Sequence, residues 1–251
     1  MTEEQKTGTE DTFISHLIEL RNRLIRATAV IVVVFLGLMP FASKIYDMVA
    51  APMMHALPAG SRMIATGVIT PFLIPVKITM LLAFLIALPW VLYQAWAFVA
   101  PGLYAHEKRL VAPLVISSSL LFLAGVAFCY FFVFGVVFKF VNDFAPKSIS
   151  VAPDIESYLD FVISMFMAFG MTFEVPIIVI VLVRMGLVSV QKLKEIRPYV
   201  IVGAFVVAAI VTPPDIMSQL LLAVPICLLY EIGLFVAPLF VKVTQAPEET
   251  A

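Results

Sequence analysis

The sequence predicts an all-α integral membrane protein that forms one domain with six transmembrane helices and no internal repeat. Hydrophobic residues make up 62% of the 251 residues, charged residues make up 13%, and the mean hydropathy is +1.06. A soluble domain carries about 25% charged residues, so this chain has too few charges to cover a soluble surface. Its apolar residues also gather in stretches that can cross the roughly 30 Å of hydrocarbon in a bilayer. Much of the surface is therefore expected to face lipid.

The first predicted span covers residues 24–42 and follows a cytoplasmic segment, residues 1–23. Within HLIELRNRLIRA, residues 16–27, leucines recur at helical spacing, which predicts a short interfacial helix before the span. The second span covers residues 71–99. It contains Lys77 near its start, from where the long side chain can reach the membrane surface.

The remaining predicted spans cover residues 110–141, 158–183, 199–212 and 218–238. The last two are separated by Thr212–Pro213–Pro214–Asp215, because prolines remove backbone donors and clash with the preceding helical turn. Both of these spans are expected to be short, and a cytoplasmic tail, residues 242–251, follows them. The outer connections, residues 43–70 and 142–157, are expected to cap the bundle, the first of them with a short amphipathic helix.

Lysine and arginine residues are divided unevenly between the two sides of these spans. With a cytoplasmic N-terminus, 11 of the 16 basic residues fall in cytoplasmic segments. Cytoplasmic loops of membrane proteins carry an excess of Lys and Arg. The sequence therefore predicts that both termini lie in the cytoplasm.

Three acidic residues lie within or beside the predicted spans. An ionised carboxylate at Glu174, deep in span four, is costly unless it is paired or solvated. We favour a role facing water or a partner over a protonated, structural role. Glu231 in span six is expected to form either an interhelical hydrogen bond or a partner contact. Asp215 is expected to cap the start of span six by accepting backbone N–H groups.

Two further acidic residues belong to segments that otherwise collect positive charge. Glu19 precedes Arg23 by one helical turn, so a local ion pair is expected between them. Glu107 lies in the loop PGLYAHEKR beside Lys108 and Arg109. Carboxylates in such basic cytoplasmic segments would suit a cationic ligand that arrives from the cytoplasm.

The sequence does not support an enzyme, a metal site or a nucleic-acid-binding protein. The motifs GxSxG and HExxH and a nucleotide-binding loop are absent. His16, His55 and His106 are split between the two predicted sides of the membrane, which argues against a shared metal site. A net charge of −1 is unlike that of a nucleic-acid binder. Ser117–Ser119 have no His or Lys partner at matching depth, so helix packing is their expected role.

Five motifs together resemble the TatC family, the core membrane subunit of the twin-arginine protein translocase. They are HLIELRNRL near the N-terminus, FVAPGLYAHEKR in the first inner loop, TFEVP in span four, RPYVIVGAFVV in span five and TPPDIMSQ before span six. The resemblance extends over about residues 12–240, with six spans in the same order. It implies a glove-shaped helical bundle with outer caps.

The resemblance implies a receptor for folded precursor proteins that carry a twin-arginine signal peptide. In the family, acidic residues that correspond to Glu19 and Glu107 contact the twin arginines, and a cavity glutamate corresponds to Glu174. Other positions that match residues important in the family are Arg21, Arg23 and Phe98 at the inner face and Pro52, Thr212, Asp215 and Gln219 at the outer face.

The resemblance also implies Sec-independent export across the bacterial inner membrane, driven by the proton-motive force and without a cofactor. The implied partners are the single-span subunits TatA and TatB, for which span five and residues 212–219 are a candidate docking surface, and further copies of the chain. The alternative is a proton-coupled small-solute transporter with Glu174 as its coupling site, although the inverted repeats common in such transporters are absent. A purely structural role would leave export unchanged by Glu174→Ala.

Overall fold

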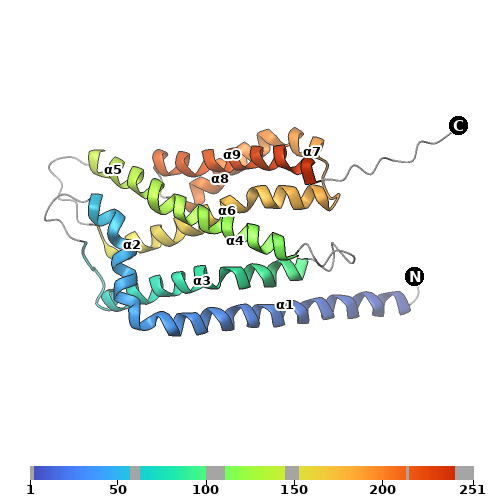
Figure 1. Cartoon of the computed structure of the whole chain (residues 1–251), viewed down its shortest axis with the longest axis horizontal. Helices are drawn as coiled ribbons and strands as arrows, with labels where there is room; N and C mark the ends of the chain where they lie inside the picture. Colours follow the sequence, from blue (N-terminus) through green and yellow to red (C-terminus); the bar gives the residue numbers. More distant parts are fainter. Residues whose placement is uncertain (1–2, 57–62, 100–110, 145–152, 213–214, 241–251) are drawn as a thin grey trace.

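The computed structural model describes residues 3–56, 63–99, 111–144, 153–212 and 215–240. Within these residues every extended regular element is a helix, and the helices form an elongated bundle (Figure 1). Five helical segments are long and apolar enough to cross a membrane, and a sixth apolar helix is shorter. The prediction of an all-α membrane fold is confirmed.

The bundle begins with a long helix, α1 (Glu3–Leu38), which lies along one side (Figure 1). The short interfacial helix expected over residues 16–27 is not a separate element, because no proline interrupts this stretch and the helix continues into the span. Pro40 lies at the start of the 3-10 turn η1 (Met39–Phe41). Its missing N–H costs no helical hydrogen bond there, and the chain then turns into α2 (Ala42–Ala56).

Helix α2 crosses one end of the bundle next to α3 and α5 (Figure 1). It contains Pro52, which has no N–H to donate to the Met48 carbonyl one turn earlier. The Tyr130 hydroxyl donates to this carbonyl at 2.7 Å, and the Tyr158 hydroxyl donates to the adjacent Val49 carbonyl at 2.9 Å. Two tyrosines of the bundle therefore hold α2 in place.

The predicted second and third spans are α3 (Thr70–Val99) and a rod formed by α4 (Val111–Phe128), η4 (Cys129–Val133) and α5 (Phe134–Phe144). In η4 the chain makes a π turn without leaving the helical path. Its first and last residues, Cys129 and Val133, are fully buried. The π turn is therefore the part of this rod that packs into the main core.

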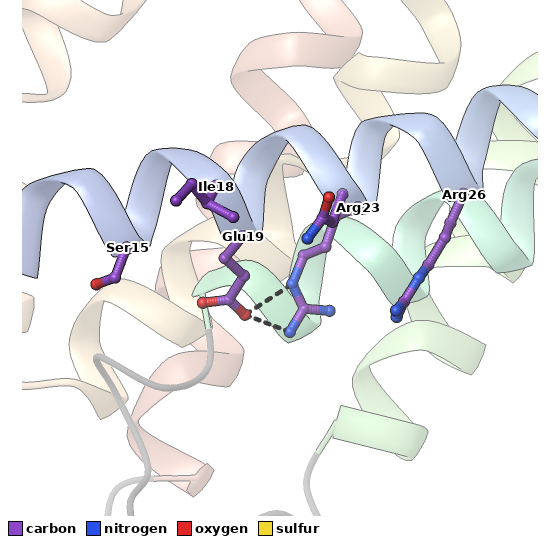
Figure 2. A pocket seen from close by; sticks show the side chains of 6 residues that line it. Ser15, Ile18, Glu19, Arg23 and Arg26 are labelled. Carbon is purple, nitrogen blue, oxygen red and sulfur yellow. Dashed lines mark hydrogen bonds and ion pairs between the residues drawn. The ribbon is translucent and has the colours of Figure 1, made fainter.

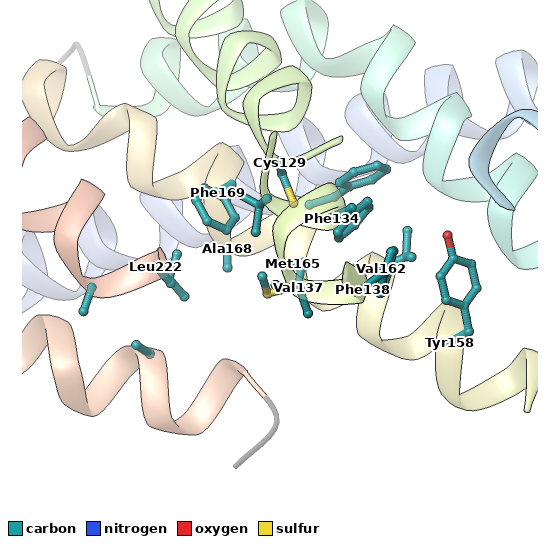
Figure 3. Packing of buried hydrophobic residues seen from close by; sticks show 14 of the residues in the cluster. Cys129, Phe134, Val137, Phe138, Tyr158, Val162, Met165, Ala168, Phe169 and Leu222 are labelled. Atoms are coloured by element: carbon teal, nitrogen blue, oxygen red, sulfur yellow. The ribbon is translucent and has the colours of Figure 1, made fainter. Parts of the chain in front are cut away.

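Helix α6 (Ile155–Arg184) lies in the middle of the bundle and packs mainly against α4 and α9. Its buried side chains Val162 and Phe169 join Phe134 and Leu222 of neighbouring helices in the main core cluster (Figure 3). Burial of such side chains contributes roughly 1.5–3 kcal/mol each in a soluble core, but in lipid the close packing itself is the stabilising term. Helix α6 thus forms the packed centre of the bundle with α4 and α9.

The last helices described are α7 (Val190–Glu195), α8 (Arg197–Val211) and α9 (Ile216–Phe240). At 1.5 Å per residue, α8 is about 22 Å long, shorter than the hydrocarbon layer, whereas α9 reaches about 37 Å. The prediction of two short spans is therefore wrong for the sixth, because its apolar run stays helical throughout. The Asp215 carboxylate accepts a 2.7 Å hydrogen bond from the Ser218 N–H, which confirms the predicted cap.

Helix α1 begins and α9 ends at the same end of the bundle, and α2 lies at the opposite end (Figure 1). We call these the inner end and the outer end, following the orientation predicted from the basic residues. Three parts of the prediction lie outside the described residues. They are the loop that contains Glu107, the pair Pro213 and Pro214, and the predicted tail over residues 242–251.

Candidate functional site

Near the inner end, α1 is joined to α3 through three polar side chains. The Arg23 guanidinium donates to Glu19 Oε1 through Nε at 2.9 Å and through Nη2 at 2.6 Å. Its Nη1 donates to Gln94 Oε1 at 3.4 Å. The predicted pair of Glu19 and Arg23 is confirmed. Gln94, which is 4% exposed, was not among the predicted site residues, because an uncharged amide in an apolar span gives no charge signal.

Glu19 borders an open pocket of about 300 Å³ on this face of α1 (Figure 2). The side chains that line it are Ser15, Ile18, Glu19, Asn22, Arg23 and Arg26. Both hydrogen bonds from Arg23 end on Oε1 of Glu19, and Oε2 accepts none from the described residues (Figure 2). One carboxylate oxygen at the pocket is therefore open to an incoming donor.

Aromatic side chains fix the same two helices beside the pocket. His16 stacks on Phe98 with ring centroids 4.3 Å apart, and Trp90 Nε1 donates to the Arg26 carbonyl at 3.3 Å. Phe98, one of the predicted site residues, thus contacts α1 directly. Arg21, another of them, is exposed and does not line the pocket.

The charges that line the pocket are one carboxylate, Glu19, and two guanidinium groups, Arg23 and Arg26. This part of the site therefore carries a net positive charge of about one. Glu107, the second carboxylate predicted to contact a cationic ligand, lies outside the described residues.

Farther along the bundle, Glu174 of α6 lies near a polar pair that joins two other helices. Trp96 Nε1 of α3 donates to Ser118 Oγ of α4 at 3.1 Å, and Ser118 lies close to the Glu174 carboxyl group. Oε1 of Glu174 is buried and has no hydrogen-bond partner in the described part of the chain. Ser118 is fully buried and joins α4 to α3 through Trp96, which agrees with the helix-packing role expected for Ser117–Ser119.

Glu231 of α9 forms an ion pair with Arg197 at 2.6 Å. Arg197 is the first residue of α8, so the pair joins the two last helices near the inner end. Of the two roles expected for Glu231, the interhelical hydrogen bond is present.

The outer-face residues of the prediction lie on two different parts of the fold. Pro52 lies on α2, about one helical turn after the Met48 and Val49 carbonyls that accept from the two tyrosines. Thr212, Asp215 and Gln219 gather where α8 ends and α9 begins. The Thr212 hydroxyl donates to the Ala208 carbonyl at 2.8 Å, and Gln219 Nε2 donates to a carbonyl of α8 at 3.3 Å. The Gln219 bond ties the start of α9 to α8, whereas Thr212 bonds back onto α8 and Asp215 caps α9.

Among the described residues no group of three or more His, Cys, Asp and Glu side chains could hold a metal ion. At Glu19 and at Glu174, one carboxylate oxygen is left without a hydrogen-bond donor from the described residues. Its chemistry suits recognition of a donor-rich ligand.

Known proteins resemble this chain over most of its length. A family model described as Sec-independent protein translocase protein (TatC) matches residues 15–225. TatC of Escherichia coli is 50% identical over 242 residues, covering 96% of this chain and 94% of the relative. TatC of Halothiobacillus neapolitanus is 52% identical over 234 residues, which cover 93% of this chain and 64% of that longer relative.

A crystal structure described as the twin arginine translocase receptor TatC has the same fold. It matches with a TM-score of 0.79 and 37% sequence identity, covering 90% of this chain and 99% of that chain. The six-helix, glove-shaped architecture expected from the sequence is thereby confirmed. Motifs, fold and family model agree, and the chain belongs to the TatC family of Sec-independent protein translocase proteins.

Proposed function

We propose that this chain is the receptor subunit of a twin-arginine translocase, which binds the signal peptides of folded precursor proteins at its inner end. The observation that carries this proposal is the geometry of Glu19. One of its oxygens is occupied by Arg23, and the other borders an open pocket on the face that would meet the cytoplasm.

Arginine is the side chain that suits this site. A guanidinium is always charged and presents a planar fork of donors, which matches a carboxylate better than the single ammonium of lysine. An exposed ion pair contributes about 0.2–1 kcal/mol, so the contact with Glu19 is worth up to about fivefold in affinity. Tight binding would then also require the apolar part of the signal peptide to contact the helices.

Two arginines need more than one carboxylate. Because the described pocket carries net positive charge, a second cationic ligand group would be repelled without a further acid. Glu107 is the residue that family resemblance assigns to this role, and the helix ends on either side of its loop, Val99 of α3 and Val111 of α4, lie at the inner end (Figure 1). We propose that Glu19 and Glu107 together receive the arginine pair.

Charge substitutions test this assignment. Purified variants would be photo-cross-linked to a twin-arginine signal peptide, and export of a folded reporter would be measured in cells that lack the native subunit. Glu19→Gln should weaken cross-linking up to about fivefold, and the reversals Glu19→Lys and Glu107→Lys should weaken it further. Glu195→Lys is the matched control, because Glu195 lies on the inner side in α7, away from the pocket. Undiminished cross-linking in both reversals would refute the proposed contact.

Export of a folded protein requires more than recognition of its signal. We propose that Glu174, with its unpartnered oxygen, faces a partner or water during transport, and that the proton-motive force drives the process. Helix α8 is about 8 Å shorter than the hydrocarbon layer, a mismatch that thins a bilayer locally at a cost of fractions of a kcal/mol per Å. This thinning would assist passage of the cargo.

The partners we propose are the single-span subunits TatA and TatB and further copies of the chain. The polar turn of Thr212, Asp215 and Gln219, together with α8, is the proposed docking surface. We also propose that the chain resides in the bacterial inner membrane with both termini in the cytoplasm. None of the relatives supports the alternative of a small-solute transporter.

A further inference from the structure

A second concave surface, separate from the pocket at Glu19, lies between α3 and α6. It is an apolar groove of about 440 Å³. On α3 it is lined by Leu73, Met80 and Phe84, and α6 contributes Ile163 and Met167. The α3 residues recur at helical spacing on one face, so they form a continuous apolar stripe.

The length of this groove matches one leaflet of a bilayer. From Leu73 to Phe84 there are eleven residue steps, which span about 16 Å at 1.5 Å per residue. One leaflet contributes about half of the roughly 30 Å hydrocarbon layer. An acyl chain fits this length, whereas a transmembrane helix of a partner would need a groove about twice as long.

Charged side chains stand at the outer end of the groove. Lys77, which lines the groove, pairs with Glu156 Oε1 at 3.5 Å and with Asp160 Oδ1 at 3.7 Å. The Thr70 hydroxyl donates to the other oxygen of Glu156 at 3.2 Å. All three charged side chains are about half exposed, at 41%, 46% and 63% for Lys77, Glu156 and Asp160. The rim thus combines one ammonium with two carboxylates.

This charge pattern selects among lipid headgroups. The rim has a net charge of about −1, so a headgroup that carries only a phosphate would meet net repulsion. A headgroup with both a phosphate and a primary ammonium can place the phosphate at Lys77 and the ammonium at Asp160 or Glu156. Primary ammonium groups also donate hydrogen bonds to carboxylates, which a quaternary ammonium cannot do.

We propose that the groove between α3 and α6 binds one zwitterionic aminophospholipid of the outer leaflet. Its acyl chain lies along the stripe from Leu73 to Phe84. Its phosphate contacts Lys77, and its ammonium contacts Asp160 and Glu156. The lipid fills the apolar surface that the two helices leave open at this depth.

Native mass spectrometry of the full chain tests this site. The detergent-solubilised protein would be titrated with equal amounts of phosphatidylethanolamine and phosphatidylglycerol that carry the same acyl chains. Wild-type protein should retain the ethanolamine lipid about threefold to tenfold more often, as expected for two exposed charge contacts. Equal retention of the two lipids would overturn the proposal.

Substitutions at the rim should change the preference in a defined direction. Asp160→Asn neutralises the net charge and should reduce the preference for the ethanolamine lipid. Glu156→Gln combined with Asp160→Asn leaves Lys77 as the one charge of this rim and should reverse the preference toward phosphatidylglycerol. Lys139→Gln, on the exposed face of α5, is the matched control and should behave like wild type. An unchanged preference in both rim variants would refute the assignment.

A final variant blocks the groove itself. Met80 is 40% exposed, so a larger side chain is accommodated there without disturbing the core. Met80→Trp should remove one bound lipid of either type. If the number of retained lipids stays the same, the lipid does not lie in this groove.

Discussion

At the scale of single residues, polar groups of this bundle form two small clusters, each with one carboxylate. In the first, hydrogen bonds run from Gln94 through Arg23 to Glu19; in the second, Trp96 donates to Ser118, which lies close to Glu174. In both clusters one carboxylate oxygen has no partner among the described residues. Buried or half-buried acceptors of this kind are costly in the resting protein, which is why they suit contact with a donor that arrives later.

Ser118 is expected to position Glu174 for its role in transport. Because Ser118 accepts from Trp96 and lies close to the Glu174 carboxyl group, its hydroxyl can donate to the glutamate. Ser118→Ala should therefore lower export of a folded reporter severalfold, and Ser118→Thr, which keeps the hydroxyl, should restore it.

Ser117→Ala is the matched control for this experiment. The Ser117 hydroxyl donates to carbonyls of its own helix at 2.8 and 3.1 Å, so its loss should not affect export. Export at the wild-type level in Ser118→Ala would show that the serine does not position Glu174.

Asp154 is expected to make folding stability depend on acid pH. Its carboxylate caps α6 by accepting from the Ser157 N–H at 3.1 Å, and it also accepts from Thr66. The hydrogen bond from Ser157 is the main cause that holds the pKa of Asp154 below its usual value. The stabilisation is therefore present above the pKa of the unfolded chain, about 3.9, and is lost as pH falls through the lower pKa of the folded protein.

Thermal unfolding of the detergent-solubilised protein between about pH 2 and 6 measures this dependence. Asp154→Asn should reduce the fall in unfolding temperature toward acid pH. Asp143→Asn, at an exposed aspartate of α5, should leave that fall as in wild type. An equal fall in unfolding temperature toward acid pH in wild type and Asp154→Asn would contradict the assignment.

At the scale of elements, α2 shows how a proline determines which neighbours a helix binds. Pro52 removes the donor that the Met48 carbonyl would receive within the helix. The carbonyl is instead paired with Tyr130, which is placed there by the π turn η4. Helix α2 is thereby linked to the rod of α4, η4 and α5 through the Met48 carbonyl oxygen.

A double-mutant cycle tests this link between Pro52 and Tyr130. In the wild-type background, Tyr130→Phe removes this exposed hydrogen bond to the Met48 carbonyl and should cost about 0.5–1.5 kcal/mol of stability. In the Pro52→Ala background the new N–H of residue 52 can reach that carbonyl, so the same tyrosine substitution should cost less. The measurement is the shift in unfolding temperature of purified protein.

Tyr158→Phe provides the control for the cycle. Its acceptor is the Val49 carbonyl, and Met53, four residues later, keeps its own N–H. The cost of Tyr158→Phe should therefore be similar with and without Pro52. Additive effects of Pro52→Ala and Tyr130→Phe would refute the link.

At the scale of the whole molecule, the centre of the bundle depends on how closely α4 and α9 approach α6. A Cβ added at Gly125 of α4 would lie 2.4 Å from the Phe169 carbonyl oxygen of α6. A Cβ at Gly233 of α9 would lie 3.0 Å from the Pro176 Cα. Small residues at such crossings let helix backbones pack closely in a membrane, where apolar burial gives no driving force.

Gly125→Ala is expected to destabilise the bundle by about 1–3 kcal/mol, because the obstructing atom belongs to a backbone that cannot move aside. Gly135→Ala is the matched control, since nothing lies within 4 Å of its added Cβ. Alanine is the better helix former, so Gly135→Ala should be neutral or slightly stabilising. Thermal unfolding of both variants checks this prediction, and equal unfolding temperatures would contradict it.

The sequence by itself determined the class of the fold, the number of spans and the family. Hydropathy and proline positions are local properties, so they indicated where apolar helices lie and why α8 stops before Asp215. The pair of Glu19 and Arg23 and the Asp215 cap were also predictable, because both form between residues within one helical turn of each other.

Contacts between distant residues were decided by the tertiary structure alone. Arg23 and Gln94 are 71 positions apart, and Trp96 and Ser118 are 22 apart. Neither pair follows a periodic pattern along the chain, so no local signal predicted that Gln94 meets Arg23 or that Trp96 meets Ser118. The continuous path of α1 and the full length of α9, which stays helical through Pro225 and Pro238, likewise do not follow from hydropathy. Spacing along one helix can be read from a sequence, whereas the side chains that meet across helices are chosen by how the helices pack.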